Sequence, residues 1–195
     1  MPVLGGAGAA TASARAGRAG IQRLGDFLTD IGTGDLGSAL RDAGLERLVG
    51  QDRFDVLDEL ITYIAGDGSD ADSQAARDAA CDVIDDVFGD ADSWDDLHAT
   101  AISAEDLPRL LEAFLARYIY NRMPVVAERL SRLFDPQAAQ QADADMRAII
   151  EDMVAIAMPT DPFNVDWSGP QGRQIADDAL RRAYEAFEGW DGDES

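Results

Sequence analysis

The sequence has no lysine, and it has only one cysteine and one histidine among 195 residues. The single cysteine, Cys81, excludes a disulfide framework within the chain, and the shortage of Cys and His excludes a zinc site of the usual four-ligand kind. No run of 18 apolar residues is present, so we expect no membrane-spanning segment. The first residues also lack the apolar stretch of a secretory signal, which favours a cytoplasmic protein.

Positive charge is scarce as well. The basic residues are 16 arginines, against 38 aspartates and glutamates, which gives a formal charge of −22 at pH 7. Binding to DNA or RNA is disfavoured because contacts to phosphate need a basic patch. Two explanations stay open for the acidity. It reflects genome composition and adaptation to a salty cytoplasm, or it forms a face that masks a basic partner, as an acidic inhibitor or nucleic-acid mimic does.

The charge is unevenly distributed along the chain. Residues 1–25 carry three arginines and no acid, whereas residues 26–195 carry the other 13 arginines and all 38 acids, a net charge of −25. Residues 1–17 are rich in Gly and Ala and have few bulky side chains to bury, so we expect a flexible basic arm. Residues 18–188 are expected to form one domain, followed by an acidic tail over residues 189–195.

The spacing of apolar residues predicts an all-α fold. They recur every three or four positions along residues 18–188, and no window alternates with period two. We therefore predict a single compact multi-helix domain of about seven or eight helices. Pro124 is expected to separate a helix over 104–121 from one over 125–134. Predicted helix starts are Asp35, Asp52, Ser93, Ser103, Asp135 with Pro136, and Ser168 with Gln171 as a capping box.

The same spacing predicts which side chains are buried. In the helix that follows Asp52, the inward face is expected to hold Phe54, Leu57, Ile61 and Ile64, widened by Val56 and Leu60. In the helix over 137–157, it is expected to hold Met146, Ile149, Ile150, Met153 and Ile156. Cys81 lies on an apolar helical stripe and is interpreted as a small core residue.

Little in the sequence points to catalysis. The acid-rich segments 67–78 and 90–96 lack the glycine and the final glutamate of a calcium-binding loop. His98, the only histidine, lies in an Asp-rich turn and is accompanied by no nucleophile motif or phosphate-binding loop. We therefore predict that the protein is not an enzyme and has no metal site and no cofactor.

Residues suited to binding a protein are more numerous. The segment "ARYIYNRM" places Arg117, Tyr118, Tyr120 and Arg122 in one helix, and Tyr and Arg are enriched at the energetic centres of protein interfaces. The alternative is structural: the tyrosines pack inward and the arginines pair with the many acids. Trp190, after the last helix, is either an exposed anchor for a partner or a residue that folds back onto that helix.

A second distinctive segment, "NVDWSGPQGR", precedes the last helix. Its Ser-x-x-Gln spacing with an early proline indicates a helix start, and Trp167 just before it can pack on the first turns of that helix. We favour this structural role over contact with a partner. The motif consists of Asp166, Trp167, Ser168, Gly169, Pro170 and Gln171.

The order of these motifs resembles the QatB family, the B component of the Qat (QatABCD) anti-phage defence system. The resemblance runs from about residue 20 to residue 188. It is carried by "LGSALRDAGLERLVGQDRFDVLDELITYIAGDGSDADSQAARDAACDVIDDVF", then "FLARYIYNRM", then "VDWSGPQGR" before a final helix.

The resemblance implies a function that composition does not. Qat systems encode an ATPase, the B protein, a QueC-like enzyme that resembles 7-cyano-7-deazaguanine synthase, and a TatD-like nuclease. The resemblance implies that the B protein is a non-catalytic binding partner and N-terminal modification client of the QueC-like enzyme, with the ATPase as a further candidate partner. Family members begin Met-Gly, whereas this chain begins Met1-Pro2, so no modified residue is carried over to this sequence.

Overall fold

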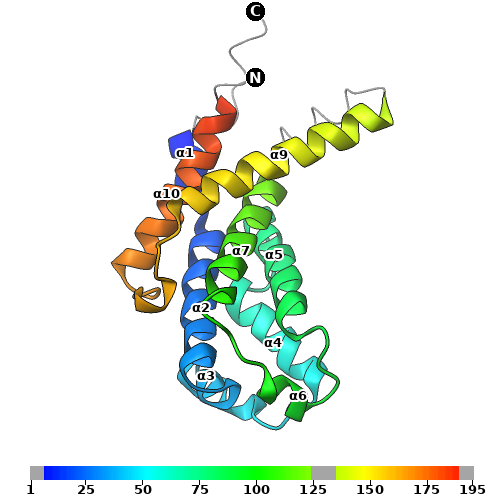
Figure 1. Ribbon diagram of the computed structural model, residues 1–195, viewed down its shortest axis with the longest axis vertical. Coiled ribbons are helices and arrows are strands. Elements are labelled where there is room, and N and C mark those ends of the chain that lie inside the picture. The colour runs from blue at the N-terminus through cyan, green and yellow to red at the C-terminus, as the bar shows by residue number, and fades with distance from the viewer. Residues whose placement is uncertain (1–6, 124–134, 189–195) are drawn as a thin grey trace, which may run out of the picture.

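The computed structural model describes residues 7–123 and 135–188, and every regular element within them is helical, which confirms the predicted all-α fold. These ranges hold nine α-helices and two short 3-10 turns, labelled as in Figure 1. The α-helices are α1 (Ala7–Ser13), α2 (Arg15–Thr33), α3 (Leu36–Asp42), α4 (Arg53–Ala65), α5 (Ala71–Phe88), α6 (Trp94–Ala99), α7 (Asp106–Arg122), α9 (Pro136–Ala157) and α10 (Pro170–Glu188). The 3-10 turns are η1 (Glu46–Leu48) and η2 (Pro162–Asn164).

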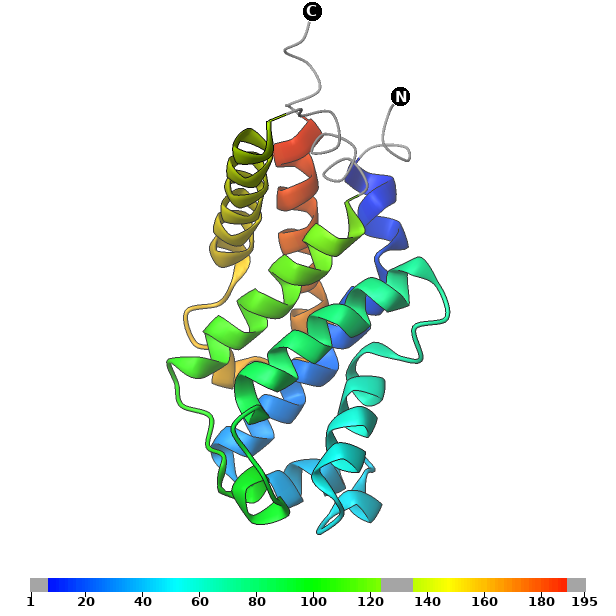
Figure 2. The ribbon, with the colours of Figure 1, turned by 90° about the vertical axis from the view of Figure 1, so that its right-hand side faces the viewer.

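Helix α2 is the centre of the bundle. It contacts α3, α4, α5, α7 and α10, and its residues Ile21, Leu24, Phe27 and Leu28 are almost completely buried. Figures 1 and 2 show α2, α5 and α7 running along the long axis of the molecule, with α3 and α6 at one end and α1 and α10 at the other. Helix α9 packs on α7 and α10 and extends sideways beyond them (Figure 1).

Several helices begin at the capping residues that the sequence predicts. The carboxylate of Asp35 accepts a hydrogen bond from the Ser38 amide at 2.7 Å, and that of Asp52 accepts one from the Phe54 amide at 2.9 Å. Asp135 likewise caps α9, with Pro136 in its first turn. These bonds satisfy amides that have no partner inside the helix, so they fix where each helix starts.

Two aromatic rings pack directly on the backbone of α2 at glycines. A Cβ atom on Gly17 would lie 2.1 Å from the ring of Tyr118, and one on Gly25 would lie 2.4 Å from the ring of Trp167. Real Cβ contacts do not come this close, so a larger residue at either position would push the ring away. Glycine is therefore what allows α7 and the segment before α10 to approach α2.

The buried face of α4 differs from the predicted one. Val56, Leu60 and Ile64 are fully buried, but Phe54 is 70% exposed. The prediction for Phe54 was wrong because the apolar residues of α4 cover a wide arc, and only the part around Leu60 faces α2 and α5. The first turn of α4 therefore presents a large aromatic side chain to solvent.

Two further predicted core positions also lie outside the core. Ile156 is 60% exposed, because α9 packs mainly on α7 and α10 and turns Val154 toward them instead. Cys81 is half-buried on α5 and is not a core residue. Ile156 and Cys81 each lie next to the buried arc of their helix. At such positions sequence periodicity does not distinguish a buried side chain from an exposed one.

Part of the predicted arm is helical. Residues Ala7–Ser13 form α1, which packs against α10, and Ala10 and Ala14 are buried. The flexibility expected for residues 1–17 stays a prediction. The predicted helix over 125–134, the acidic tail and Trp190 lie outside the described residues.

Candidate interface at the N-terminal end of the body

Arg122 and Asp72 join five helices where α1 meets the body. Arg122, at the C-terminal end of α7, places Nε 2.8 Å from Oδ1 of Asp72 in the first turn of α5. The second carboxylate oxygen of Asp72 accepts a hydrogen bond from the amide of Ala16, in the first turn of α2, at 2.8 Å. Asp72 therefore does for α2 what a capping residue does, although it comes from another helix.

The same guanidinium fixes α1. Arg122 Nη1 donates to the carbonyl of Ala10 at 3.0 Å, and Nη2 donates to Oγ of Ser13 at 2.6 Å. Nη1 also donates to the hydroxyl of Tyr184 on α10, at 3.1 Å. Arg122 thus attaches the first described helix to α5, α7 and α10 through one side chain that is only 14% exposed. We call Arg122, Asp72 and Tyr118 the N-terminal anchor.

Tyr118, one turn before Arg122 on α7, completes the anchor. Its ring is fully buried against Gly17, and its hydroxyl donates a hydrogen bond to Asp72. Burial, and then the bond to Asp72, raise the pKa of Tyr118 far above its ordinary value, and burial likewise raises the pKa of Tyr184. Both hydroxyls therefore stay protonated at physiological pH and keep acting as neutral partners in the anchor.

The other two residues of "ARYIYNRM" face neighbouring helices. Arg117 pairs with Asp86 of α5 at 3.1 Å and lies 3.5 Å from Asp82. Tyr120 donates a hydrogen bond to Asp143 of α9, and the guanidinium of Arg147 lies 3.8 Å from the centre of its ring. The four residues singled out by sequence thus serve three separate contacts inside the molecule and do not form one surface.

Trp167 is also placed inside the molecule. It is fully buried, and its Nε1 donates to the carbonyl of Pro162 at 3.0 Å. The side chain of Gln22 on α2 donates to the carbonyls of Ser168 and Gly169 at 3.1 and 3.2 Å. The segment before α10 is therefore attached to the middle of α2 by a ring and two hydrogen bonds.

The start of α10 does not use the predicted capping box. Ser168 Oγ donates to the carboxylate of Asp166, which also accepts from the Gly169 amide at 3.0 Å, and the Gly172 amide donates to the Asp166 carbonyl at 3.2 Å. Asp166 thus organises the turn, in place of the expected pair Ser168 and Gln171. Pro170 is the first residue of α10, as the sequence predicts.

One known protein family matches most of the chain. The family model of the Qat anti-phage system associated protein QatB matches residues 5–187 of the 195. The chain belongs to the QatB family. No curated protein and no solved structure matches it at a significant level. Membership in the QatB family gives the chain a role in the Qat anti-phage system and agrees with the resemblance found in the sequence.

Two further findings concern metal binding and membrane spanning in this QatB family member. Within residues 7–123 and 135–188, no three Cys, His, Asp or Glu side chains are grouped so that they could hold a metal ion. None of the helices in the described part of the chain is long and apolar enough to cross a membrane.

The residues that Arg122 contacts in the N-terminal anchor could not be identified from the sequence. Asp72 is one of many acids in an acid-rich segment, and Ala10 and Ser13 belong to the expected arm. No local signal connects these residues with Arg122, because the contacts join segments that are far apart in the chain. The high content of small residues before α2 is the one relevant signal, since small side chains let α1 lie close to α10.

Proposed function

We propose that this QatB family member is a non-catalytic component of the Qat system that binds the QueC-like enzyme and presents its own N-terminal segment for modification. The observation that carries the proposal is the N-terminal anchor. Arg122 binds Ala10 and Ser13 at one end of the helical bundle, so the segment that precedes Ala7 starts from a defined place on the body. A substrate protein benefits from such an arrangement because fixing the start of the segment lowers the entropy lost when an enzyme captures it.

The environment of the two most reactive side chains supports a non-catalytic role. Burial, with the nearby acids Asp78 and Asp82, raises the pKa of the Cys81 thiol, whereas catalytic cysteines have lowered values. His98 is exposed, lies 3.7 Å from Asp35 and packs near the ring of Trp94. Neither neighbour of His98 is a nucleophile that it could activate.

The proposal is tested with the purified protein and the purified QueC-like enzyme of the same operon. We expect a complex on size-exclusion chromatography, and a gain in intact mass that peptide mapping assigns to the segment before Ala7 when the enzyme is supplied with its substrates. Absence of both complex and mass gain, at low as well as physiological salt, would rule out the client role. The operon ATPase is a second binding candidate for the same chromatography.

A matched pair of variants tests the contribution of the anchor. Arg122→Ala removes the bonds to Ala10, Ser13 and Asp72, and Arg181→Ala removes an exposed arginine whose partner Asp178 lies on the same helix. We expect slower modification only for Arg122→Ala. Equal rates for both variants would leave the client role standing and exclude the anchor as its cause.

The surface charge supports a second candidate, an acidic inhibitor that masks a basic protein surface. Most of the described arginines are engaged in ion pairs, for example Arg18 with Asp177 and Arg77 with Asp58, so the excess carboxylates dominate the surface. Binding driven by this charge would fall steeply as salt increases. A partner that stays bound in 0.5 M salt, a concentration at which the screening length is only about 4 Å, would exclude this candidate.

A further inference from the structure

A single residue, Ala14, separates helices α1 and α2. Helix α1 ends at Ser13 and α2 begins at Arg15, and the φ and ψ angles of Ala14 are −78° and 60°. The φ angle is already close to that of an α-helix, so only ψ departs, by about 100° from the helical value of about −42°. Rotation about one bond therefore decides whether residues 7–33 form one helix or two.

The local sequence does not explain this break. Residues 12–16 read Ala-Ser-Ala-Arg-Ala, without the proline or glycine that usually interrupts a helix. Alanine is the strongest helix former, and a helix that is already formed, such as the docked α2, extends without the cost of a new nucleus. The cause of the break therefore lies in contacts with the rest of the molecule.

Side chains from other helices take the place of the helical hydrogen bonds that are missing at this break. In a continuous helix each amide would donate to the carbonyl four residues earlier. Instead, the Ala16 amide donates to Oδ2 of Asp72 at 2.8 Å, and Nη1 of Arg122 donates to the Ala10 carbonyl at 3.0 Å. Since Arg122 and Asp72 are themselves joined at 2.8 Å, one ion pair bonds to both sides of the break.

Arg18 holds the same break from the α2 side. Its Nη2 donates to the carbonyl of Thr11 in the last turn of α1, and its Nε donates to Asp177 on α10. The guanidinium therefore connects the end of α1 to α10. We call Arg18, Asp72 and Arg122 the hinge clamp, because together they bond to the chain on both sides of the break.

Apolar packing contributes little to the position of α1. Ala10 and Ala14, with one methyl group each, are the buried residues of the segment 8–14. Oγ1 of Thr11 is buried without a hydrogen-bond partner in the described part of the chain, which is unfavourable while α1 lies on α10. The position of α1 therefore depends mainly on the hinge clamp.

We propose that Ala14 is a hinge and that the hinge clamp holds it in the broken state. When the clamp opens, Ala14 becomes helical and α1 joins α2 as one helix. Helix α1 then leaves α10, because a rotation of about 100° redirects everything that precedes the hinge. The closed clamp thus keeps the segment before Ala7 beside α10, and the open clamp directs it along the axis of α2. This device goes beyond the proposed function, which concerns only the closed state.

The test observes the hinge and α1 in the purified protein. The carbon chemical shifts of Ala14 in NMR spectra show whether this residue is helical. Spin labels attached to Gly8→Cys on α1 and Glu185→Cys on α10 give the distance between the two helices, in a Cys81→Ser background that removes the native thiol. Both labelled positions are exposed, and a Cβ atom on Gly8 would have no other atom within 4 Å.

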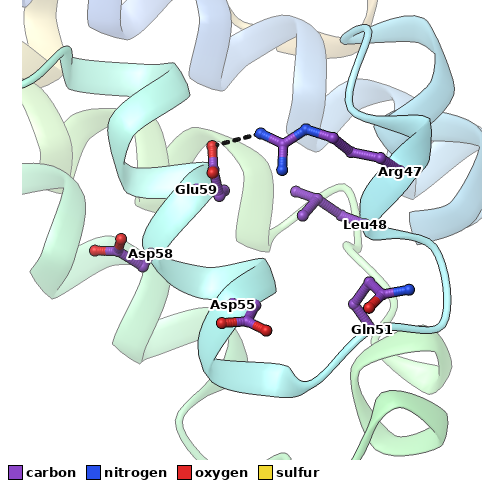
Figure 3. Close-up of a pocket in the computed structure, with 6 residues that line it drawn as sticks. All are labelled: Arg47, Leu48, Gln51, Asp55, Asp58 and Glu59. Atoms are coloured by element: carbon purple, nitrogen blue, oxygen red, sulfur yellow. Dashed lines mark ion pairs between the residues drawn. The ribbon is translucent and has the colours of Figure 1, made fainter.

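Two substitutions open the clamp, and a third serves as the control. Arg122→Ala and Arg18→Ala each remove bonds to α1, and they are studied singly and combined. Arg47→Ala removes an ion pair of 2.9 Å with Glu59, beside the pocket between η1 and α4 and away from α1 (Figure 3). Melting temperatures show whether each variant is folded.

We expect the clamp variants to shift the Ala14 carbon signals into the range of helical alanines, and to lengthen the distance between the labels while its distribution stays narrow. The Arg47→Ala control should match the wild type in both measurements. Ala14 signals that are unchanged in all the folded clamp variants, or a broad distance distribution that reports an unfolded α1, would overturn the hinge. Neither measurement involves the QueC-like enzyme, so the hinge and the client role can fail independently, the latter being read from the mass of the N-terminal segment.

Discussion

The guanidinium of Arg122 and the carboxylate of Asp72 form the ion pair that ties the start of the chain to its body, with Nε 2.8 Å from Oδ1. Both side chains are mostly buried, at 14% and 19% exposure, and both make further hydrogen bonds to α1 and α2. A partly buried pair whose remaining polar atoms are also satisfied is the arrangement in which an ion pair contributes to stability.

Arg122→Ala should therefore lower the free energy of unfolding by about 1.5–3 kcal/mol, since it removes hydrogen bonds to a charged group and leaves Asp72 without its cation. Urea unfolding followed by circular dichroism measures this loss. Arg181→Ala is the control, and it should change the stability by no more than about 0.5 kcal/mol because its side chain is 52% exposed. Equal losses for the two variants would mean that the anchor does not stabilise the fold.

Trp167→Ala should cost about 3–5 kcal/mol, because it empties the space of a fully buried indole and removes the hydrogen bond to Pro162. Trp94, which is only partly buried, provides the comparison, and Trp94→Ala should cost clearly less. Unfolding is best followed by circular dichroism, since both changes remove a fluorophore. If Trp167→Ala were as stable as Trp94→Ala, its role would have to be sought in partner binding instead.

Gly17→Ala should destabilise the protein by about 1–3 kcal/mol, although alanine favours helices, because the new methyl group would lie 2.1 Å from the Tyr118 ring. Gly8 in α1 has no atom within 4 Å of the position that a Cβ atom would take, so Gly8→Ala should instead stabilise by up to about 1 kcal/mol. Opposite shifts in melting temperature are the expected result. A neutral or stabilising Gly17→Ala would show that the ring can move aside freely.

The acids of α2 should make the free energy of unfolding depend on pH, in a direction that follows from their pKa shifts. Burial, with the charges of Asp42 and Asp26, raises the pKa of Asp30, so the folded chain holds this proton more tightly than the unfolded chain. The charged carboxylate is therefore unfavourable at pH 7, and the cost disappears as the pH falls through the raised pKa toward about 4. Asp30→Asn should therefore stabilise the protein at pH 7, and this gain should disappear as the pH falls below the unfolded pKa of about 3.9.

Asp35 should make the free energy of unfolding depend on pH in the opposite direction to Asp30. The hydrogen bond from the Ser38 amide lowers the pKa of Asp35, so its contribution is present above the unfolded pKa of about 3.9 and is lost as the pH falls through the lowered value. Asp35→Asn should therefore change stability most at neutral pH, and in the destabilising direction. Parallel pH profiles for the variants at positions 30 and 35 would contradict both assignments.

The helices can be predicted from sequence because their signals are local. Asp35, Asp52 and Asp135 each cap a helix through an amide two or three residues away, so the pattern is contained in a short window. Phe54 cannot be placed in this way, because the apolar arc of α4 is wider than the face that α2 and α5 cover. Which part of an arc is buried depends on neighbouring helices, and periodicity does not contain that information.

The candidate site is less predictable than the fold. The type and neighbours of Arg122 indicate a binding residue, but its partners Asp72 and Ala10 come from distant segments without any motif. Trp167 is predicted to have a structural role, yet its packing against Gly25 depends on the path of α2 beneath it. The contacts that define the site are long-range, whereas the sequence signals are short-range.

The glycines of α2 have a consequence for how the protein folds. Each glycine inside a helix lowers helix stability by about 0.5–1 kcal/mol relative to alanine, and α2 carries several, including Gly17, Gly20 and Gly25. The isolated segment should therefore be largely unstructured, and it becomes helical only when the rings of Tyr118, Phe114 and Trp167 dock on it. Helix α2 contacts most of the other helices, so these helices cannot pack on it until the three rings are in place. The whole bundle is therefore expected to form in a single cooperative step.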